Sequence, residues 1–354
     1  MTLHTFGKSV RNLRNRVLID VNRRLGREFV PLQDKILCIE TTSVCNLKCR
    51  FCAYEKKSSE RLSMTEDFFA DVVGQATAMG LVRYHLTPCT GDVFMDQSLL
   101  EKLERLDADP RVEWYDFFTN FTLPSAEDIE RLLGLRKLKS MKISVYGHDL
   151  ESFVAITKST EKVYRRLLAN LETILARLDR VRFQLSLGLR TAYDGGIQGS
   201  SDLQHLLRRF KDAGVHIHKT RVFNNWGGMI TQEDVTGLGI DVTGADFTYK
   251  RGACSLLFTA VQVMATGIVN ACACRDVDAT LRIGDLHEKP LNEILSSSNA
   301  AYLKIIREQQ AGAFRPVCKS CDFYRSIYRV VRGDRGRGFS SLEEFLANND
   351  RSRN

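Results

Sequence analysis

Residues 36–223 alternate short β-rich runs with stretches of helical periodicity, and this alternation constrains the fold more than any other feature. Six such runs are recognised: ILCIE (36–40), RYHLTP (83–88), EWYDFFTN (113–120), MKISVYG (141–147), RFQLSLGLR (182–190) and HIHKTRVF (216–223). Two of the intervening helices begin with the spacing of an N-cap and its reciprocal acid, Ser63 with Glu66 and Ser125 with Asp128. The pattern predicts an α/β fold of parallel strands joined by helical crossovers.

The composition is that of a globular protein. The chain has 354 residues, 44% of them hydrophobic and 27% charged, which excludes a disordered or collagen-like chain and suggests two domains or one large barrel with an appendage. The longest apolar stretch, Phe258 to Ala273, is shorter than the ~20 residues that span a bilayer, so no transmembrane segment is expected. The N-terminus lacks the apolar region of a secretory signal, so a cytoplasmic protein is expected. In that reducing compartment the ten cysteines are expected to bind metal rather than form disulfides.

Both ends of the chain are rich in arginine. Val10, Leu13, Val17 and Val21 recur at helical spacing, which predicts an amphipathic basic helix over residues 8–25 within an N-terminal segment of residues 1–34. Such a helix could meet phosphate, nucleic acid or an anionic membrane. We favour a helix that packs across the domain with a solvated basic face. Nucleic acid is not expected as a partner, because the terminal arginines lack interleaved aromatic residues.

The strand–helix pattern ends at Gly227 and Gly228, and a cysteine-rich region begins near Tyr249. We therefore expect a barrel domain over residues 35–228 and a second domain over residues 249–330, with a strand pair around Gly267. Residues 331–354 are predicted to be a basic tail with a short helix.

Cys45, Cys49 and Cys52 follow the first predicted strand, in the sequence CNLKCRFC. Three thiolates can hold a [4Fe-4S] cluster whose fourth iron is open to bind another molecule, whereas a closed electron-transfer cluster takes four protein ligands. A zinc site would need a fourth ligand nearby, and no Cys or His lies between Cys52 and His85. The spacing favours a cluster with an open, reactive iron.

The segment CNLKCRFC, with Phe51 before its third cysteine, resembles the signature of the radical S-adenosylmethionine (radical SAM) superfamily. The resemblance implies that S-adenosylmethionine chelates the open iron and that one electron from a low-potential donor of the flavodoxin or ferredoxin type cleaves it to a 5'-deoxyadenosyl radical. It also implies a partial (β/α)6 TIM-like barrel, which agrees with the six strands expected above.

The same resemblance suggests residues that bind the cofactor. Thr90, Gly91 and Asp92 occupy the place of the family's Gly-Gly-Glu turn, which meets the amino group of the cofactor. This sequence departs from that turn but keeps a small residue, a glycine and an acid. Thr119 and Asn120 resemble the pair near the ribose, and Ser144 lies in a segment like the usual Ser-x-x-Gly. Phe51 and Arg190 complete the predicted cofactor site, with Arg190 offering a bidentate fork to the cofactor carboxylate or lying as a surface arginine.

Cys254, Gly267, Cys272, Cys318 and Cys321 have a spacing that resembles the auxiliary-cluster domains called SPASM and twitch. Glycine at a hairpin tip would let two cysteines face one metal, and the later pair would complete four ligands of an auxiliary [4Fe-4S] cluster. The twitch type, with one auxiliary cluster, fits better because no cysteine follows Cys321. Cys274 could replace Cys272, and a structural zinc site is the competing interpretation.

A primary carbon radical abstracts hydrogen from an unactivated C–H bond, so we expect an oxidoreductase that acts on a carbohydrate-like small molecule, with the auxiliary cluster accepting the second electron of an alcohol oxidation. Epimerisation, decarboxylation, dehydration and peptide maturation are the alternatives. A non-catalytic electron carrier is disfavoured by the three-cysteine motif. Arg221 is a candidate to hold an alkoxide. The alternative is that it forms a structural ion pair. Cys89 is a candidate hydrogen-atom donor, or a small buried residue.

Overall fold

A computed structural model describes residues 3–32, 35–86, 89–244, 248–330 and 338–351. Its centre is a mixed sheet with the strand order β12-β11-β10-β2-β3-β4-β5-β6-β7. Neighbours from β10 to β7 are parallel, whereas β11 and β12 are antiparallel. The strands are β2 (Ile36–Ile39), β3 (Arg83–His85), β4 (Trp114–Thr119), β5 (Leu138–Tyr146), β6 (Gln184–Arg190), β7 (His216–Thr220), β10 (Gln262–Val263), β11 (Ile268–Asn270) and β12 (Arg282–Asp285).

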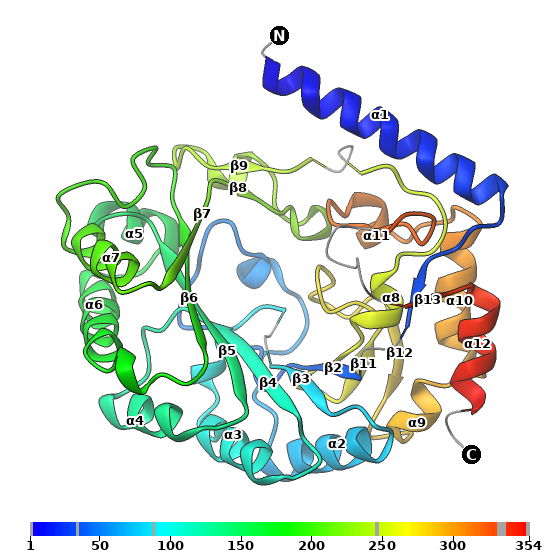
Figure 1. Ribbon diagram of the computed structural model, residues 1–354, viewed down its shortest axis with the longest axis horizontal. Helices are drawn as coiled ribbons and strands as arrows, with labels where there is room; N and C mark the ends of the chain where they lie inside the picture. The colour runs from blue at the N-terminus through cyan, green and yellow to red at the C-terminus, as the bar shows by residue number, and fades with distance from the viewer. Residues whose placement is uncertain (1–2, 33–34, 87–88, 245–247, 331–337, 352–354) are drawn as a thin grey trace.

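The predicted α/β fold is confirmed, and the six predicted strands correspond to β2–β7. Residues 87–88 of the second run lie outside the described residues. The sixth run is divided, because β8 (Val222–Phe223) leaves the main sheet and pairs with β9 (Asp241–Val242). Figure 1 shows β2–β7 curving as an open barrel with helices along its outside.

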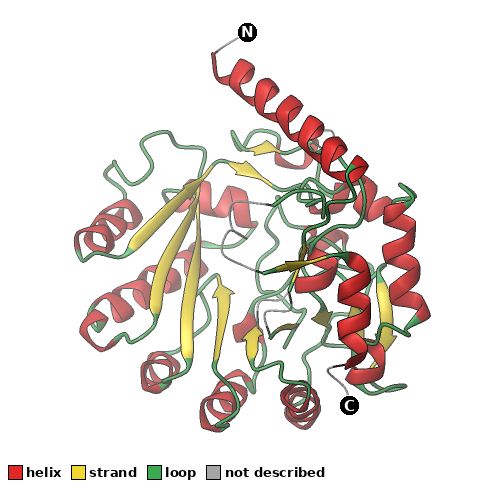
Figure 2. Cartoon of the chain, turned by 45° about the vertical axis from the view of Figure 1, so that its right-hand side comes forward, coloured by secondary structure: helices red, strands yellow, loops and turns green. Residues whose placement is uncertain are grey.

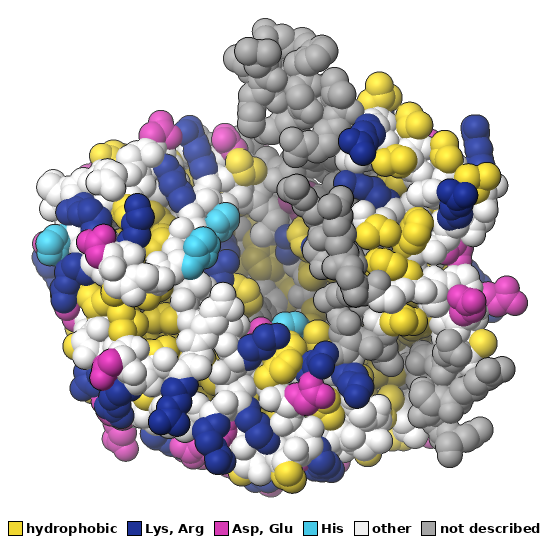
Figure 3. All heavy atoms as spheres, viewed as in Figure 1, with side chains coloured by type: hydrophobic (Ala, Val, Ile, Leu, Met, Phe, Trp, Pro, Cys, Tyr) yellow, Lys and Arg dark blue, Asp and Glu magenta, His cyan; other side chains and the backbone are white. Residues whose placement is uncertain are grey.

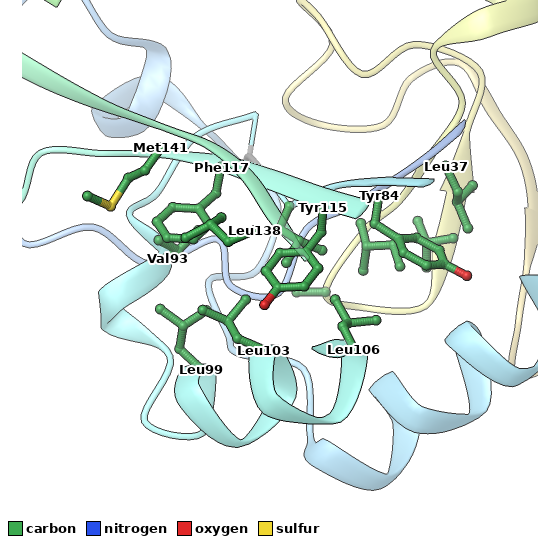
Figure 4. Close-up of a cluster of buried hydrophobic side chains, with 14 of the residues drawn as sticks. Leu37, Tyr84, Val93, Leu99, Leu103, Leu106, Tyr115, Phe117, Leu138 and Met141 are labelled. Carbon is green, nitrogen blue, oxygen red and sulfur yellow. The ribbon is translucent and has the colours of Figure 1, made fainter. Parts of the chain in front are cut away.

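The helices on the outside of the sheet bury its outer face. Leu37, Tyr84 and Tyr115 lie side by side in the parallel register and are at most 1% exposed. Figure 4 shows their side chains on the same side of the sheet as Leu99, Leu103 and Leu106 of α3, toward which Tyr115 points. Because side chains alternate along a strand, the neighbouring residues of β2–β6 face the inside of the barrel. The outer helices are α2 (Glu66–Ala78), α3 (Leu99–Ala108), α4 (Ala126–Gly134), α5 (Leu150–Thr157), α6 (Glu161–Leu175) and α7 (Asp202–Asp212).

One of the two predicted N-caps is confirmed. Ser125 and Asp128 form a reciprocal capping box at α4. The prediction for Ser63 is wrong, because its hydroxyl bonds the Thr42 hydroxyl at 2.8 Å and the N-cap of α2 is Thr65, which accepts from Phe68 N.

The cysteine-rich region continues the barrel sheet instead of forming a sheet of its own. The predicted strand pair around Gly267 is present as β10 and β11, and β10 runs parallel to β2. Figure 2 shows short helices packed beside these strands. These elements are α8 (Leu256–Thr259), α9 (Leu291–Ile294), α10 (Ala300–Gln310), α11 (Pro316–Ser320) and α12 (Leu342–Arg351), with β1 (Val30–Pro31) paired to β13 (Phe339–Ser340).

The predicted N-terminal helix is α1 (Leu3–Arg24), which lies at one side of the molecule in Figure 1. The prediction that its apolar residues pack across the domain is wrong. Leu13, Val17 and Val21 are 64%, 53% and 44% exposed, because the helix meets the rest of the chain through its asparagine-rich side. Among the described residues, no helix is long and apolar enough to cross a membrane.

Candidate active site

Cys45, Cys49 and Cys52 lie together in the loop after β2. Cys45 Sγ accepts from Leu47 N at 3.4 Å, and Cys52 N donates to Cys49 O at 2.9 Å, which folds the loop back on itself. Burial raises the pKa of the Cys52 thiol to about 11, and burial together with Cys45 and Cys52 raises that of Cys49. Cys49 is buried and Cys45 and Cys52 are half-buried. Three thiols close enough to influence one another are a donor set that fits a metal cluster, whose positive charge would favour the thiolates.

Phe51 and Arg190 are brought together beside these cysteines. The Arg190 guanidinium carbon lies 5.2 Å from the centre of the Phe51 ring, 5.9 Å from that of Tyr146 and 5.5 Å from that of Phe223. Arg190 also lowers the pKa of Cys49 and Cys52, against the larger effect of burial. In the part of the chain that the structure describes, no carboxylate pairs with Arg190. The Arg190 guanidinium is thus available to bind an anion, as the predicted contact with the cofactor carboxylate requires.

Gly91 lets the loop after β3 touch the cysteine loop. Its φ is +127°, and a Cβ there would lie 2.9 Å from Val44 O and 3.0 Å from Thr42 O. Asp92 N donates to Val44 O at 2.9 Å, which joins the two loops. Close backbone approach therefore requires glycine at this place.

The Asp92 side chain is turned into the protein. Its carboxylate accepts from Asn120 N at 2.6 Å, from the Thr119 hydroxyl at 3.1 Å and from Phe94 N at 3.1 Å. Burial raises the pKa of Asp92 to about 6. The structure thus brings three of the predicted cofactor residues into one network, in which Asp92 positions Thr119 and Asn120.

Two further polar groups lie at this edge of the sheet. Asn46, inside the cysteine motif, accepts from Asn120 Nδ2 at 2.9 Å and donates to the Thr122 hydroxyl at 2.9 Å. Sequence reasoning missed Asn46, although its place between Cys45 and Cys49 was a signal. Ser144 stands opposite Gly188 in the register of β5 and β6 and is buried.

Five cysteines, Cys254, Cys272, Cys274, Cys318 and Cys321, line one small cavity in the C-terminal region. Four of these sulfurs accept an N–H hydrogen bond: Cys254 from Arg325 N, Cys272 from Cys274 N, Cys318 from Gln309 Nε2 and Cys321 from Phe323 N, at 3.2–3.5 Å. These four are the predicted ligands, and N–H donors to sulfur are the contacts that tune thiolate ligands.

A single zinc ion would draw its thiolates to roughly 3.8 Å of one another, given Zn–S bonds of about 2.3 Å in a tetrahedron. No three Cys, His, Asp or Glu side chains among the described residues converge closely enough to hold one metal ion.

Cys89 and Trp226 lie between the two groups of cysteines. The Cys89 thiol is 3.7 Å from Ala273 O and packs with Ala53 and Trp226. Trp226 Nε1 donates to Phe51 O at 2.9 Å, and the Arg275 guanidinium lies 6.0 Å from the centre of its ring. The φ of Trp226 is +50°, an unusual value for a side chain of this size, as expected where the surrounding structure fixes the backbone.

Arg221 stands apart from this centre. Its guanidinium is 3.0 Å from Asp194 Oδ1 and 3.9 Å from Asp241 Oδ2, and its side chain is 47% exposed. This is the arrangement of a structural ion pair, so the geometry does not favour the predicted catalytic role.

The inner face of the barrel carries polar groups that sequence reasoning missed. His85 Nδ1 lies 2.6 Å from Asp116 Oδ1, and the Ser140 hydroxyl is 3.4 Å from Asp116 Oδ2. The Lys142 side chain passes over Gly188, where a Cβ would be 3.0 Å from its Cε. Burial, and then Arg190, lower the pKa of Lys142. These side chains come from neighbouring strands, and Figure 3 shows a hollow in this side of the molecule.

Sequence reasoning also missed a buried pair at the end of β2. Glu40 and Lys57 side chains are each 1% exposed and 4.0 Å apart, and Glu40 Oε1 accepts from Ala265 N at 3.4 Å. Among the described residues, Glu40 Oε2 has no hydrogen-bond partner. Burial raises the pKa of Glu40 to about 7.

Comparison with known proteins agrees with this geometry. The profile of the radical SAM superfamily matches residues 39–195, and that of the SPASM iron-sulfur cluster-binding domain matches residues 254–322. No curated protein sequence matches the chain significantly.

Three solved structures share the fold. BtrN in complex with AdoMet and 2-DOIA has a TM-score of 0.51 at 14% identity, over 81% of this chain and 92% of BtrN. Streptococcus suis SuiB bound to precursor peptide SuiA has 0.52 at 15% identity, over 89% and 76%. Native anSMEcpe with bound AdoMet has 0.50 at 13% identity, over 90% and 95%. The chain belongs to the radical SAM superfamily and carries a SPASM-type iron-sulfur cluster-binding domain after its partial barrel.

Proposed function

We propose that the protein is a radical SAM oxidoreductase that oxidises an alcohol of a carbohydrate-like small molecule. The observation that carries the proposal is the polar inner face of the barrel, where His85, Asp116, Ser140 and Lys142 stand in neighbouring strands. When bound, S-adenosylmethionine and the two [4Fe-4S] clusters would supply the hydrogen-abstracting radical and the acceptor for the second electron. A low-potential donor of the flavodoxin or ferredoxin type would reduce the first cluster.

The cofactor-binding residues keep their predicted roles in this proposal. Cys45, Cys49 and Cys52 hold the first cluster, and Cys254, Cys272, Cys318 and Cys321 hold the auxiliary cluster. Arg190 offers its fork to the cofactor carboxylate. Asn120, oriented by Asp92 and Asn46, binds the ribose beside Ser144.

We assign the proton transfer to His85 instead of Arg221. Asp116 accepts from His85 Nδ1, which leaves Nε2 to take the hydroxyl proton of the substrate. The His85 side chain is 38% exposed, so a substrate inside the barrel can reach it. Cys89 is buried against Ala273 O. It has no role in the proposed oxidation and would be the hydrogen-atom donor only if the enzyme were an epimerase.

BtrN was crystallised with 2-DOIA and SuiB with a precursor peptide, so the structural neighbours do not choose between the small-molecule and peptide proposals. The inner face favours the first, because hydroxyl groups and imidazole pair with substrate hydroxyls.

The test is a screen of sugars, cyclitols and peptides with anaerobically reconstituted, reduced protein. The expected result is a product two mass units lighter than one polyol, with deuterium from its C–H carbon appearing in 5'-deoxyadenosine. His85→Asn should lower product about 100-fold while retaining 5'-deoxyadenosine release, and His205→Asn, an exposed change on α7, should have no effect. Turnover of peptides alone would overturn the proposal.

A further inference from the structure

Helix α1 docks onto the protein through its polar side and leaves its apolar side in solvent. Asn22 Nδ2 donates to Tyr328 O at 2.9 Å, and Asp20 accepts from the Tyr249 hydroxyl at 2.8 Å. Asn12 and Asn15 line the cleft between α1 and the C-terminal region, and Ile19 is the one apolar and buried residue of this side among the side chains that the structure describes. An ordinary surface helix has the opposite arrangement.

The exposed apolar residues lie on one side of the helix, and we call them the α1 stripe. Its members are Leu13 (64% exposed), Val17 (53%), Leu18 (41%), Val21 (44%) and Leu25 (58%). At about 100° per residue, they span an arc of roughly 140°. Figure 3 shows hydrophobic and basic side chains next to one another along this part of the molecule. Five of the nine large hydrophobic residues found exposed among the described residues thus belong to one helix and the residue after it.

The charges around the α1 stripe are almost all positive. Residues 8–27 contain seven Lys or Arg and a single acid, Asp20, which is used by Tyr249. In the described part of the chain, no carboxylate pairs with Arg14, Arg24 or Arg27, and all three are exposed. Arg14 and Arg24 lie on the same side of the helix as the α1 stripe, among its apolar residues. A helix side that combines exposed apolar residues with unpaired arginines is typical of helices that lie in the headgroup region of anionic membranes.

We infer that α1 binds the surface of a membrane containing anionic lipid, with the α1 stripe in the acyl boundary and the arginines at the headgroup phosphates and carboxylates. A second copy of the chain is a poorer occupant, because pairing two such stripes would bring their arginines together with no acid to offset them. This inference is independent of the proposed reaction.

The experiment is flotation of the full chain with vesicles of phosphatidylcholine alone and of phosphatidylcholine with about 30% phosphatidylserine. We expect binding to the anionic vesicles alone, falling with rising salt because surface charges are screened. Leu13→Ser/Val17→Ser/Val21→Ser should reduce the bound fraction about tenfold, and Arg14→Gln/Arg24→Gln should weaken binding in proportion to the charge removed. Val222→Ser, at an exposed apolar residue outside α1, is the matched control.

The variants should fold, because the altered side chains are exposed and the rest of the protein does not depend on their contacts. Circular dichroism and iron content check this. Equal flotation with neutral vesicles, or unchanged flotation of the triple variant, would overturn the inference. A dimer in light scattering that the triple variant dissociates, without vesicle binding, would assign the α1 stripe to a second copy and overturn it as well. Binding to a DNA duplex that depends on the arginines but not on the α1 stripe would have the same consequence.

Discussion

Five thiols surround the C-terminal cavity, but a cubane cluster takes four. In the described residues, an N–H donor reaches Cys272 Sγ but none reaches Cys274 Sγ. Cys274 instead lies close enough to Cys38 and Cys89 to raise the pKa of both thiols, a smaller effect than their burial. The hydrogen bonding therefore favours Cys272 as the ligand.

The first prediction follows for these two residues. Cys272→Ser should lower iron from about eight to about four per chain, because the auxiliary cluster loses a ligand. Cys274→Ser should keep about eight. Iron and sulfide analysis with EPR of anaerobically reconstituted protein measures both, and the reverse result would make Cys274 the ligand.

The second prediction concerns Glu40, whose pKa is raised from 4.5 to about 7 by burial. A carboxyl with a raised folded pKa favours the folded state less as pH rises from 4.5 to 7, since only the unfolded chain then ionises it freely. Glu40→Gln removes this ionisation. The free energy of unfolding of the variant, minus that of wild type, should therefore increase by up to about 3 kcal/mol as the pH rises from 4.5 to 7.

Urea unfolding of both proteins across this pH range, under anaerobic conditions, gives the comparison. The loss of the Lys57 partner shifts the variant at every pH, so the slope of the difference is the informative quantity. A difference that is flat with pH would mean that Glu40 titrates near its ordinary value.

At the residue scale, sequence reasoning found what local spacing encodes. Cys45, Cys49 and Cys52 are neighbours in the chain, so their grouping needs no knowledge of the fold. His85 and Asp116 are 31 residues apart and meet because β3 and β4 are paired in register. Glu40 and Lys57 meet because the cysteine loop returns over β2. Neither pair leaves a periodic trace in the sequence.

At the element scale, Gly91 joins the loop after β3 to the cysteine loop. Its φ of +127° and its contact with the backbone of residues 42–44 leave no space for a side chain. Gly74 lies inside helix α2 with nothing within 4 Å of a Cβ. Replacing glycine with alanine adds one methyl group at either position, and we expect it to have opposite effects on stability at the two positions.

The third prediction is that Gly91→Ala lowers stability by about 1–3 kcal/mol through backbone strain and weakens S-adenosylmethionine binding by displacing Asp92. Gly74→Ala should stabilise the protein by about 0.5–1 kcal/mol, because alanine restricts the unfolded chain and favours helix. Thermal unfolding and equilibrium binding of S-adenosylmethionine test both. Unchanged binding in a destabilised Gly91→Ala protein would separate the turn from the cofactor.

The periodicity of the sequence predicted the helices and strands better than it predicted their contacts with the rest of the protein. It predicted β2–β7 and helix α1, since period and length are properties of a short segment. It did not predict which side of α1 meets the rest of the protein, because that depends on the contacts of Asp20 with Tyr249 and of Asn22 with Tyr328, far along the chain. Ser63 failed as an N-cap for the same reason, since its partner Thr42 belongs to another segment.

At the scale of the whole molecule, one continuous sheet joins the barrel to the cysteine-rich region. Gln262 and Val263 of β10 pair with Cys38 and Ile39 of β2, and Glu40 N donates to Val263 O at 2.8 Å. The sequence indicated a separate C-terminal domain because β10 and β11 are too short to show that they extend the barrel. The sheet thus joins the strand before Cys45 to the strands before Cys272.

The last prediction follows from this continuity. A chain ending at residue 248 loses β10, so β2 becomes an edge strand, and Glu40 and Lys57 lose the cover of Ala265. An unpaired hydrophobic edge and a buried pair opened to solvent both favour aggregation over folding. We expect this truncated chain to lack a cooperative thermal transition and to bind no iron at Cys45, Cys49 and Cys52. The control is Cys318→Ser/Cys321→Ser in the full chain, which keeps β10 and loses only the auxiliary ligands, and it should unfold cooperatively with about four irons. A truncated chain that unfolds cooperatively and binds about four irons would instead make the barrel an independent domain, with β10 a later addition to its edge.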